Sequence, residues 1–103
     1  MGTKKLLEND QVIVTEIVLA PGESTGVHRH EFDYVVHVIS GATLKATDGN
    51  GDNATDVPLR AGDTFHFQIR GECAISGELE TTALHNAENV SSETYRELMV
   101  ELK

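Results

Sequence analysis

The stretch of sequence that decides the fold is PGESTGVHRHEFDYVVHVISG, residues 21–41. It opens with a Pro-Gly turn signal, continues with two histidines that are separated by one residue, and ends in a β-rich run that stops at Gly41. On a strand, positions i and i+2 project from the same face, so His28 and His30 lie close enough to share one metal ion. An isolated His-x-His pair more often means two exposed or hydrogen-bonded histidines, so the surrounding residues must decide.

Strand signals continue along the chain on both sides of this stretch. Runs rich in β-branched or alternating residues are separated by turns of Gly, Asp and Asn, of which residues 48–52 are the strongest hairpin signal. The last run also has the composition of a helix, but its alternation at every second position favours a strand. Many short strands between such turns are typical of an all-β sandwich or barrel. The predicted strands cover residues 12–19, 32–40, 42–47, 55–59, 64–69 and 95–102, with a short one near 73–75.

Length and charge restrict the class of protein. With 103 residues the chain predicts a single domain, residues 1–103, with a core from about residue 10 onward. Its 17 acidic and 8 basic residues give a net charge of −9, which argues against nucleic acid or an anionic membrane surface as partner. Cys73 is the sole cysteine and the N-terminus lacks a secretory h-region. We therefore expect a soluble, cytoplasmic protein.

Two motifs resemble those of the cupin superfamily. Residues 22–41 are similar to the first cupin motif, with Gly22, the two histidines and Gly41 all in register. Near the C-terminus, His85 and Asn89 have the spacing that ends the second motif, and residues 59–63 look like the turn that opens it. The resemblance covers most of residues 10–103 and is nearest to small cupins associated with β-alanine catabolism. It implies a double-stranded β-helix (a jelly-roll barrel), a homodimer, and His28, His30 and His85 as metal ligands.

The sequence departs from the cupin pattern in three places. Tyr34 stands where the first motif has a glutamate, and Glu31 and Asp33 lie on the opposite strand parity from the histidine pair. The Pro-x-Gly of the second motif is absent. The stretch of 22 residues between Gly62 and His85 is longer than usual, so residues 71–82 must form a loop or an added hairpin before His85.

The chemistry that follows is that of an open metal site. Three neutral imidazoles would hold one divalent transition-metal ion, namely iron, zinc, nickel, manganese or copper, and leave positions for water or substrate. Without the glutamate, an anionic ligand such as a small carboxylate supplies the compensating charge. Tyr34 shares the parity of the histidines, which predicts that it faces inward. It is either a candidate catalytic residue that donates a hydrogen bond or a core aromatic.

Other residues leave alternatives open. His66 faces inward if Phe65 and Phe67 pack outward, and it is then the substitute third ligand if His85 does not reach the ion; the alternative is a structural histidine. His37 should face away from the site. Cys73 is expected to be an idle or buried thiol. Two functions remain: a metal-dependent enzyme acting on a small carboxylate metabolite, or a non-catalytic cupin that binds a small molecule in its barrel with a degenerate metal site.

Overall fold

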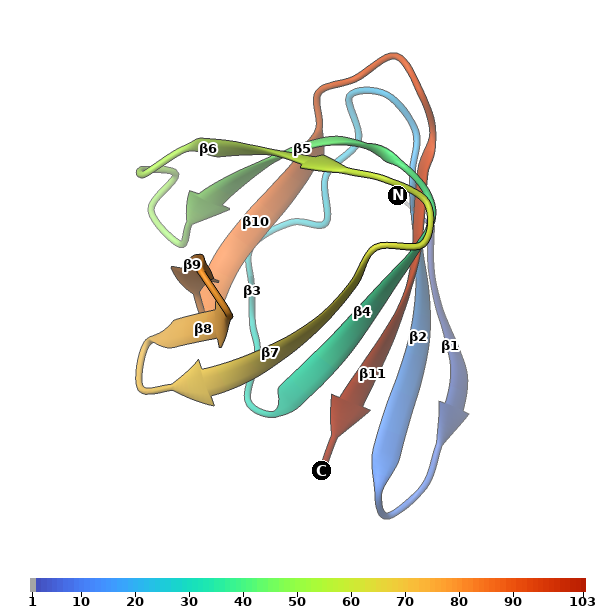
Figure 1. Ribbon diagram of the computed structural model, residues 1–103, viewed down its shortest axis with the longest axis vertical. Helices are drawn as coiled ribbons and strands as arrows, with labels where there is room; N and C mark the ends of the chain where they lie inside the picture. The colour runs from blue at the N-terminus through green and yellow to red at the C-terminus, as the bar shows by residue number, and fades with distance from the viewer. Residues whose placement is uncertain (1) are drawn as a thin grey trace.

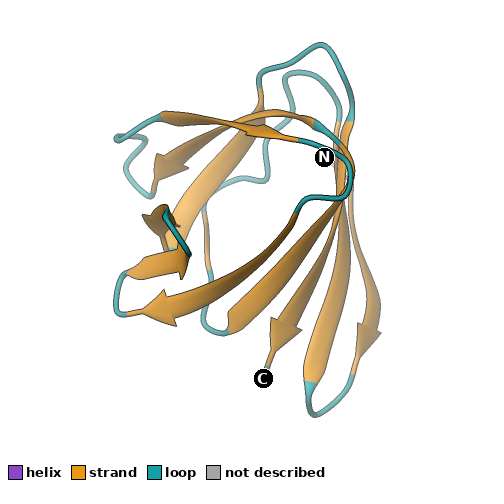
Figure 2. Cartoon of the chain, in the orientation of Figure 1, coloured by secondary structure: helices purple, strands orange, loops and turns teal. Residues whose placement is uncertain are grey.

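The computed structural model describes residues 2–103, and all of the regular structure in this range is β-strand (Figure 2). Three predicted strands have the predicted bounds, and the other four differ by one residue at one end. Within residues 2–103, no helix is long and apolar enough to cross a lipid bilayer. The strands are β1 (Gly2–Glu8), β2 (Val12–Leu19), β3 (His28–Arg29), β4 (Asp33–Ser40), β5 (Ala42–Asp48), β6 (Thr55–Leu59), β7 (Thr64–Arg70), β8 (Cys73–Ser76), β9 (Leu79–Thr82), β10 (Leu84–Asn89) and β11 (Tyr95–Leu102).

The strands form two antiparallel sheets that curve toward each other (Figure 1). The larger sheet has the order β1-β2-β11-β4-β7-β8-β9, and the smaller has the order β3-β10-β5-β6. In each sheet a strand from late in the chain lies between two earlier ones, since β11 lies between β2 and β4 and β10 lies between β3 and β5. This is the crossing of the chain between two sheets that a jelly roll requires. The predicted all-β jelly-roll barrel is therefore confirmed.

The core lies between the two sheets and follows the alternation of the strands. In β4, Tyr34, Val36 and Val38 are buried, and the residues between them are more exposed. The inner face of β11 carries Tyr95 and Met99 in the same way. The buried apolar residues are Leu19, Tyr34, Val36, Val38, Ala42, Leu44, Phe67, Ala74, Tyr95 and Met99.

Four strands, β1, β3, β9 and β10, lie outside the predicted ranges. β1 pairs with β2 at the edge of the larger sheet, although its Lys4 and Lys5 gave no strand signal. β10 has the polar sequence LHNAEN and is a strand because β3 and β5 hydrogen-bond to it on both sides. Residues 73–82 form the β8–β9 hairpin, which was one of the two forms expected for the added segment.

The motif residues Gly41 and Asn89 have structural roles. A Cβ at Gly41 would lie 2.9 Å from the Arg60 Cα and still closer to the Leu59 carbonyl, so this crossing of β-strands has no room for a side chain. Asn89 is fully buried, and its Nδ2 donates hydrogen bonds to the Leu19 carbonyl at 2.9 Å and the Glu93 carbonyl at 2.7 Å. Asn89 thus holds together the end of β2 and the turn before β11.

Candidate metal centre

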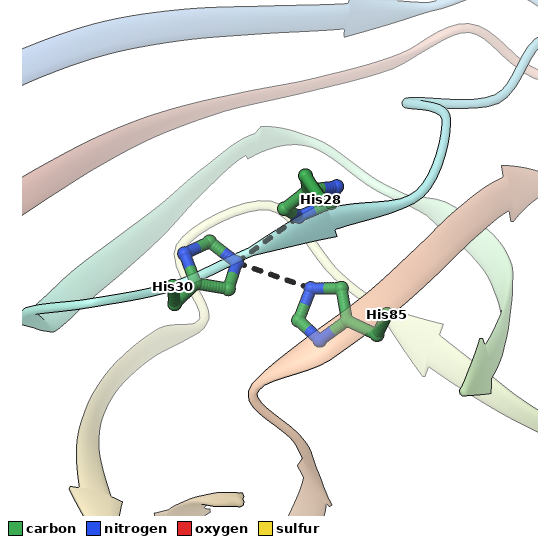
Figure 3. A group of neighbouring side chains, drawn as sticks. All are labelled: His28, His30 and His85. Atoms are coloured by element: carbon green, nitrogen blue, oxygen red, sulfur yellow. Dashed lines mark hydrogen bonds between the residues drawn. The ribbon is translucent and has the colours of Figure 1, made fainter. Parts of the chain in front are cut away.

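Three histidines from two strands meet at one place between the sheets (Figure 3). His28 on β3 pairs directly with His85 on β10, and such cross-strand neighbours share a face of the sheet. His30 lies directly after β3, two residues beyond His28, and its backbone N donates a hydrogen bond of 2.8 Å to the Ala83 carbonyl. The strand pairing thus brings together residues that are 55 positions apart.

The ring nitrogens converge closely. The Nε2 atom of His30 lies 3.0 Å from the Nε2 atom of His28 and 3.1 Å from that of His85 (Figure 3). The three ring centroids are 4.5–4.7 Å apart. One ligating nitrogen from each residue lies within 4.8 Å of the others, so the three histidines are positioned to hold a single metal ion.

Backbone carbonyls fix the orientation of two of the rings. The Nδ1 atom of His28 lies 2.9 Å from the Gly26 carbonyl, and the Nδ1 atom of His85 lies 2.7 Å from the Thr82 carbonyl. Because a carbonyl only accepts, each Nδ1 carries the hydrogen and each Nε2 presents a lone pair to the centre. Gly26 has a φ of +79°, a backbone conformation that residues with a side chain rarely adopt, and this conformation directs its carbonyl toward the His28 ring.

Burial keeps two of the three histidines, His30 and His85, uncharged. Removal from water, followed by the neighbouring His85 and His28, lowers the pKa of His30 from 6.5 to about 3. Removal from water and the proximity of His28 also lower the pKa of His85 to about 4. At neutral pH both rings are therefore unprotonated, which is the form that binds a metal ion.

The donor set fits a divalent transition metal. Metal–nitrogen bonds of about 2.1 Å at right angles place the two nitrogens about 3.0 Å apart. The observed separations of 3.0 and 3.1 Å agree with this value. Two of the three rings also have the backbone hydrogen bond at Nδ1 that orients metal-binding histidines.

Tyr34 packs directly against this cluster. Its ring stacks on His30 with centroids 4.1 Å apart, and Phe67 stacks on its other side at 5.0 Å. Tyr34 is 3% exposed, which confirms that it faces inward. Its hydroxyl makes no hydrogen bond to any residue in the range 2–103. Burial, then the charges of Glu97 and Glu101, raise the pKa of Tyr34, so the hydroxyl is a neutral donor.

A cavity of about 130 Å³ opens beside the histidines and the tyrosine. Most of its wall is apolar, with Val36, Leu44, Phe65 and Met99 among the lining residues. Its polar lining consists of Thr25, His28, His30, Tyr34, Thr81, His85, Tyr95 and Glu97. The cavity combines a small volume with a few polar groups, as small-molecule sites do.

The prediction of His66 as a substitute third ligand is wrong. Phe65 and Phe67 both point into the barrel, and Phe67 stacks on Tyr34, so His66 between them is exposed on the outer face. His37 is exposed as predicted, and its Nδ1 lies 2.8 Å from the Thr64 hydroxyl.

The carboxylates near the histidine pair stay out of the cluster. Asp33 accepts a hydrogen bond of 2.9 Å from the Ile69 backbone N, and Glu31 is exposed. Cys73 is half-buried, and a hydrogen bond with Glu80 leads the causes that raise its pKa, as expected for an idle thiol.

Sequence reasoning missed Glu97. It lies on β11, is 9% exposed, and its Oε1 accepts a hydrogen bond of 2.9 Å from the Tyr95 hydroxyl. Burial raises its pKa to about 7, against the lowering effect of that hydrogen bond. The alternation of the strand does indicate its burial, because Glu97 points to the same face as Tyr95 and Met99, two residue types that are often buried in a core.

Known proteins with similar sequences were found by comparison with individual relatives. No family model matches the sequence. The β-alanine degradation protein BauB of Pseudomonas aeruginosa is 44% identical over 59 residues, 57% of this chain and 60% of that protein. The oxalate-binding protein of Thermotoga maritima is 33% identical over 70 residues, 68% of this chain and 54% of that protein. The chain matches less than two thirds of the length of either relative.

Structural similarity extends over nearly the whole chain. The crystal structure of a cupin domain from Bordetella pertussis has a TM-score of 0.76 at 26% identity, and the match covers 98% of this chain and 91% of that one. The two sheets, the motif glycines and the three converging histidines agree with this likeness. The chain belongs to the cupin superfamily.

Proposed function

We propose that this protein binds one divalent transition-metal ion through His28, His30 and His85 and uses it to bind the carboxylate of a small metabolite. The observation that carries the proposal is the convergence of three histidine Nε2 atoms beside a cavity. The ion, when bound, supplies a Lewis-acidic centre with open positions for an oxygen ligand. The residues of this chain hold that centre, shape the cavity and orient the ligand.

The absence of a carboxylate in the ligand set favours an anionic ligand. A divalent ion held by three neutral nitrogens keeps its full charge of two, and no carboxylate among residues 2–103 joins the cluster within ligand distance. A carboxylate from solution compensates this charge in a partly desolvated place. The oxalate-binding relative from Thermotoga maritima supports the same class of ligand.

Tyr34 is the residue that would orient this ligand. Its ring lies against His30, and its hydroxyl has no hydrogen-bond partner among residues 2–103 although the side chain is buried. No fully enclosed side-chain nitrogen or oxygen among residues 2–103 lacks a partner, so this hydroxyl keeps some accessible surface through which water or a ligand can accept its hydrogen bond. A carboxylate oxygen of a ligand bound at the metal can accept the hydrogen bond that the Tyr34 hydroxyl donates.

Metal analysis tests the first half of the proposal. Protein made without a histidine tag, in medium supplemented with iron, zinc, nickel, manganese and copper, should carry about one ion per chain. His28→Ala and His85→Ala should each remove most of it, whereas His37→Ala and His66→Ala, which change exposed histidines, should not. Metal content below about a tenth of an equivalent in the wild-type protein would overturn the proposal.

A thermal-shift experiment tests the second half. Ligands that bind only the folded state raise the melting temperature, so oxalate and short monocarboxylates should raise it in metal-loaded protein and not after chelation. The competing function is metal-independent binding in the barrel. It predicts that the response persists when His28 and His30 are both replaced by alanine, and that result would favour it over the metal-dependent function.

A further inference from the structure

The cavity has a second polar group, away from the histidines. Glu97 and Tyr34 both line it, but they lie at different heights along the adjacent strands β11 and β4. The residue paired with Tyr34 is Glu101, whereas Glu97 pairs with Val38. Four residues of extended strand therefore separate the two levels, about 13 Å along the strand. The cavity thus has a histidine end and a carboxyl end.

The carboxyl group of Glu97 is incompletely satisfied by the protein. Its Oε1 accepts the hydrogen bond from Tyr95, but its Oε2 has no partner among residues 2–103. In the same part of the chain no side-chain nitrogen or oxygen is both fully enclosed and unpartnered, so Oε2 keeps some accessible surface. Because Glu97 lines the cavity, this oxygen is available to a molecule inside it.

Glu97 also lacks a counter-ion. The ion pairs formed by residues 2–103 involve other acidic side chains, and no lysine, arginine or histidine pairs with Glu97. A buried carboxylate without a cation is strongly unfavourable, and an apolar residue in its place would stabilise the strand. A cationic group of a ligand would supply the missing partner through a charge-assisted hydrogen bond.

We propose that Glu97 is a specificity-determining residue that binds the ammonium group of a short ω-amino acid whose carboxylate lies at the histidine end. This inference rests on the proposed function, because it needs the metal-held carboxylate to fix the other end of the ligand. The apolar wall between the two ends, which includes Val36 and Met99, suits the methylene groups of such a molecule. Tyr95 acts as a positioning residue, since its hydroxyl holds one oxygen of the carboxyl group.

Calorimetry on the metal-loaded full chain tests this inference. The probes are three amino acids of increasing length, 3-aminopropionate, 4-aminobutyrate and 5-aminopentanoate, each compared with propionate, butyrate or pentanoate of the same chain length. At least one amino acid should bind about tenfold more tightly than its matched carboxylate, as expected for one charge-assisted contact. The chain length with the largest ratio reports the span between the two ends.

Two variants assign the preference to one residue. Glu97→Gln keeps the shape and the Tyr95 hydrogen bond but removes the charge, so it should reduce the preference to about threefold or less and leave carboxylate affinity within about twofold. Glu16→Gln is the control, because Glu16 faces outward on the adjacent strand β2 and does not line the cavity. Should Glu97→Gln fail to fold by circular dichroism, Glu97→Met gives the same comparison with an apolar side chain.

The outcomes separate this inference from the function on which it rests. Equal affinities for amino acids and their matched carboxylates would overturn the role of Glu97 while leaving the proposed function intact. A preference that persists in Glu97→Gln and Glu97→Met would also overturn it. No binding of any carboxylate to metal-loaded protein would overturn the proposed function, and this inference with it.

Discussion

The ring of Tyr34 lies almost parallel to the ring of His30, with an interplanar angle of 22° and centroids 4.1 Å apart. The tyrosine occupies the position where the first cupin motif has a glutamate, so an aromatic ring supports the cluster from the side and a carboxylate ligand is lost. The stack holds the His30 ring in place, while the hydroxyl stays without a partner in the described part of the chain. A mutation that removes only the hydroxyl of Tyr34 can therefore test ligand binding without disturbing the stacked ring.

We expect Tyr34→Phe to keep the fold and the metal but weaken carboxylate binding. Phenylalanine preserves the stack on His30, and the lost hydroxyl leaves no protein group without a partner, so the free energy of unfolding should change by less than about 1 kcal/mol. Carboxylate affinity should fall roughly threefold to tenfold. Urea denaturation and calorimetry measure the two effects, and Tyr34→Ala, which should cost about 3–5 kcal/mol, is the destabilising comparison. Unchanged affinity in Tyr34→Phe would contradict the orienting role.

Removal of the metal should lower the melting temperature. An ion that binds only the folded state contributes about 2.7 kcal/mol at a free concentration one hundred times its Kd. Chelation should therefore shift the transition of the wild-type protein by several degrees. His85→Ala should melt at the same temperature with and without chelator. A shift of equal size in that variant would show that the chelator acts elsewhere.

The pH dependence of stability should reveal the burial of Glu97. Its pKa is about 7 in the folded protein against an ordinary value of 4.5, so between these values the folded state keeps a proton that the unfolded state releases. The contribution of Glu97 to stability therefore falls as pH rises from about 4.5 to about 7 and is constant above. Tyr95 and Tyr34, which face the same cavity, have raised pKa values and stay neutral throughout.

Glu97→Gln is the variant that isolates this effect. Its melting temperature relative to the wild-type protein should increase as pH rises through this range, because each unit of the pKa shift corresponds to about 1.4 kcal/mol. Measuring both proteins in parallel cancels the contribution of His30 and His85, whose lowered pKa values act in the opposite direction. A difference that does not vary with pH would show that Glu97 ionises normally.

Asn89→Ala should be among the more damaging single substitutions outside the cavity. It removes the donors to the Leu19 and Glu93 carbonyls and the acceptor for the Ser91 backbone N, all in a fully buried place. We expect a loss of about 2–4 kcal/mol in the free energy of unfolding by urea denaturation. Asn50→Ala, in the exposed β5–β6 turn, is the matched control and should change it by less than about 0.5 kcal/mol.

Local sequence pattern was sufficient to predict seven of the strands in residues 2–103 and the pairing of His28 with His30, whereas the third histidine came from the resemblance to the cupin motifs. The spacing of His28 and His30 predicts that they share a face, and the cupin motif implies that His85 joins them as a ligand. The outward orientation of His66 was also readable, since two phenylalanines flank it and a barrel buries the larger apolar area.

Other features depend on contacts that no local pattern reports. β10 is a strand only because two other strands hydrogen-bond to it, and its own residues are polar. The orientation of the His28 and His85 rings depends on the carbonyls of Gly26 and Thr82, whose directions are set by turns. Burial of Glu97 could be inferred from parity, but its exposure to a cavity depends on how both sheets curve.

The β8–β9 hairpin contributes to the shape of the cavity but not to the group of residues that would hold the ion. It extends the larger sheet beyond β7, and its Leu79 and Thr81 form part of the cavity wall, yet it carries none of the three histidines. Substitutions at these two wall positions change which molecules fit while the ion-holding rings stay where β3 and β10 put them. Selectivity in this scaffold can therefore diversify through a short surface insertion without renewed selection for ion affinity.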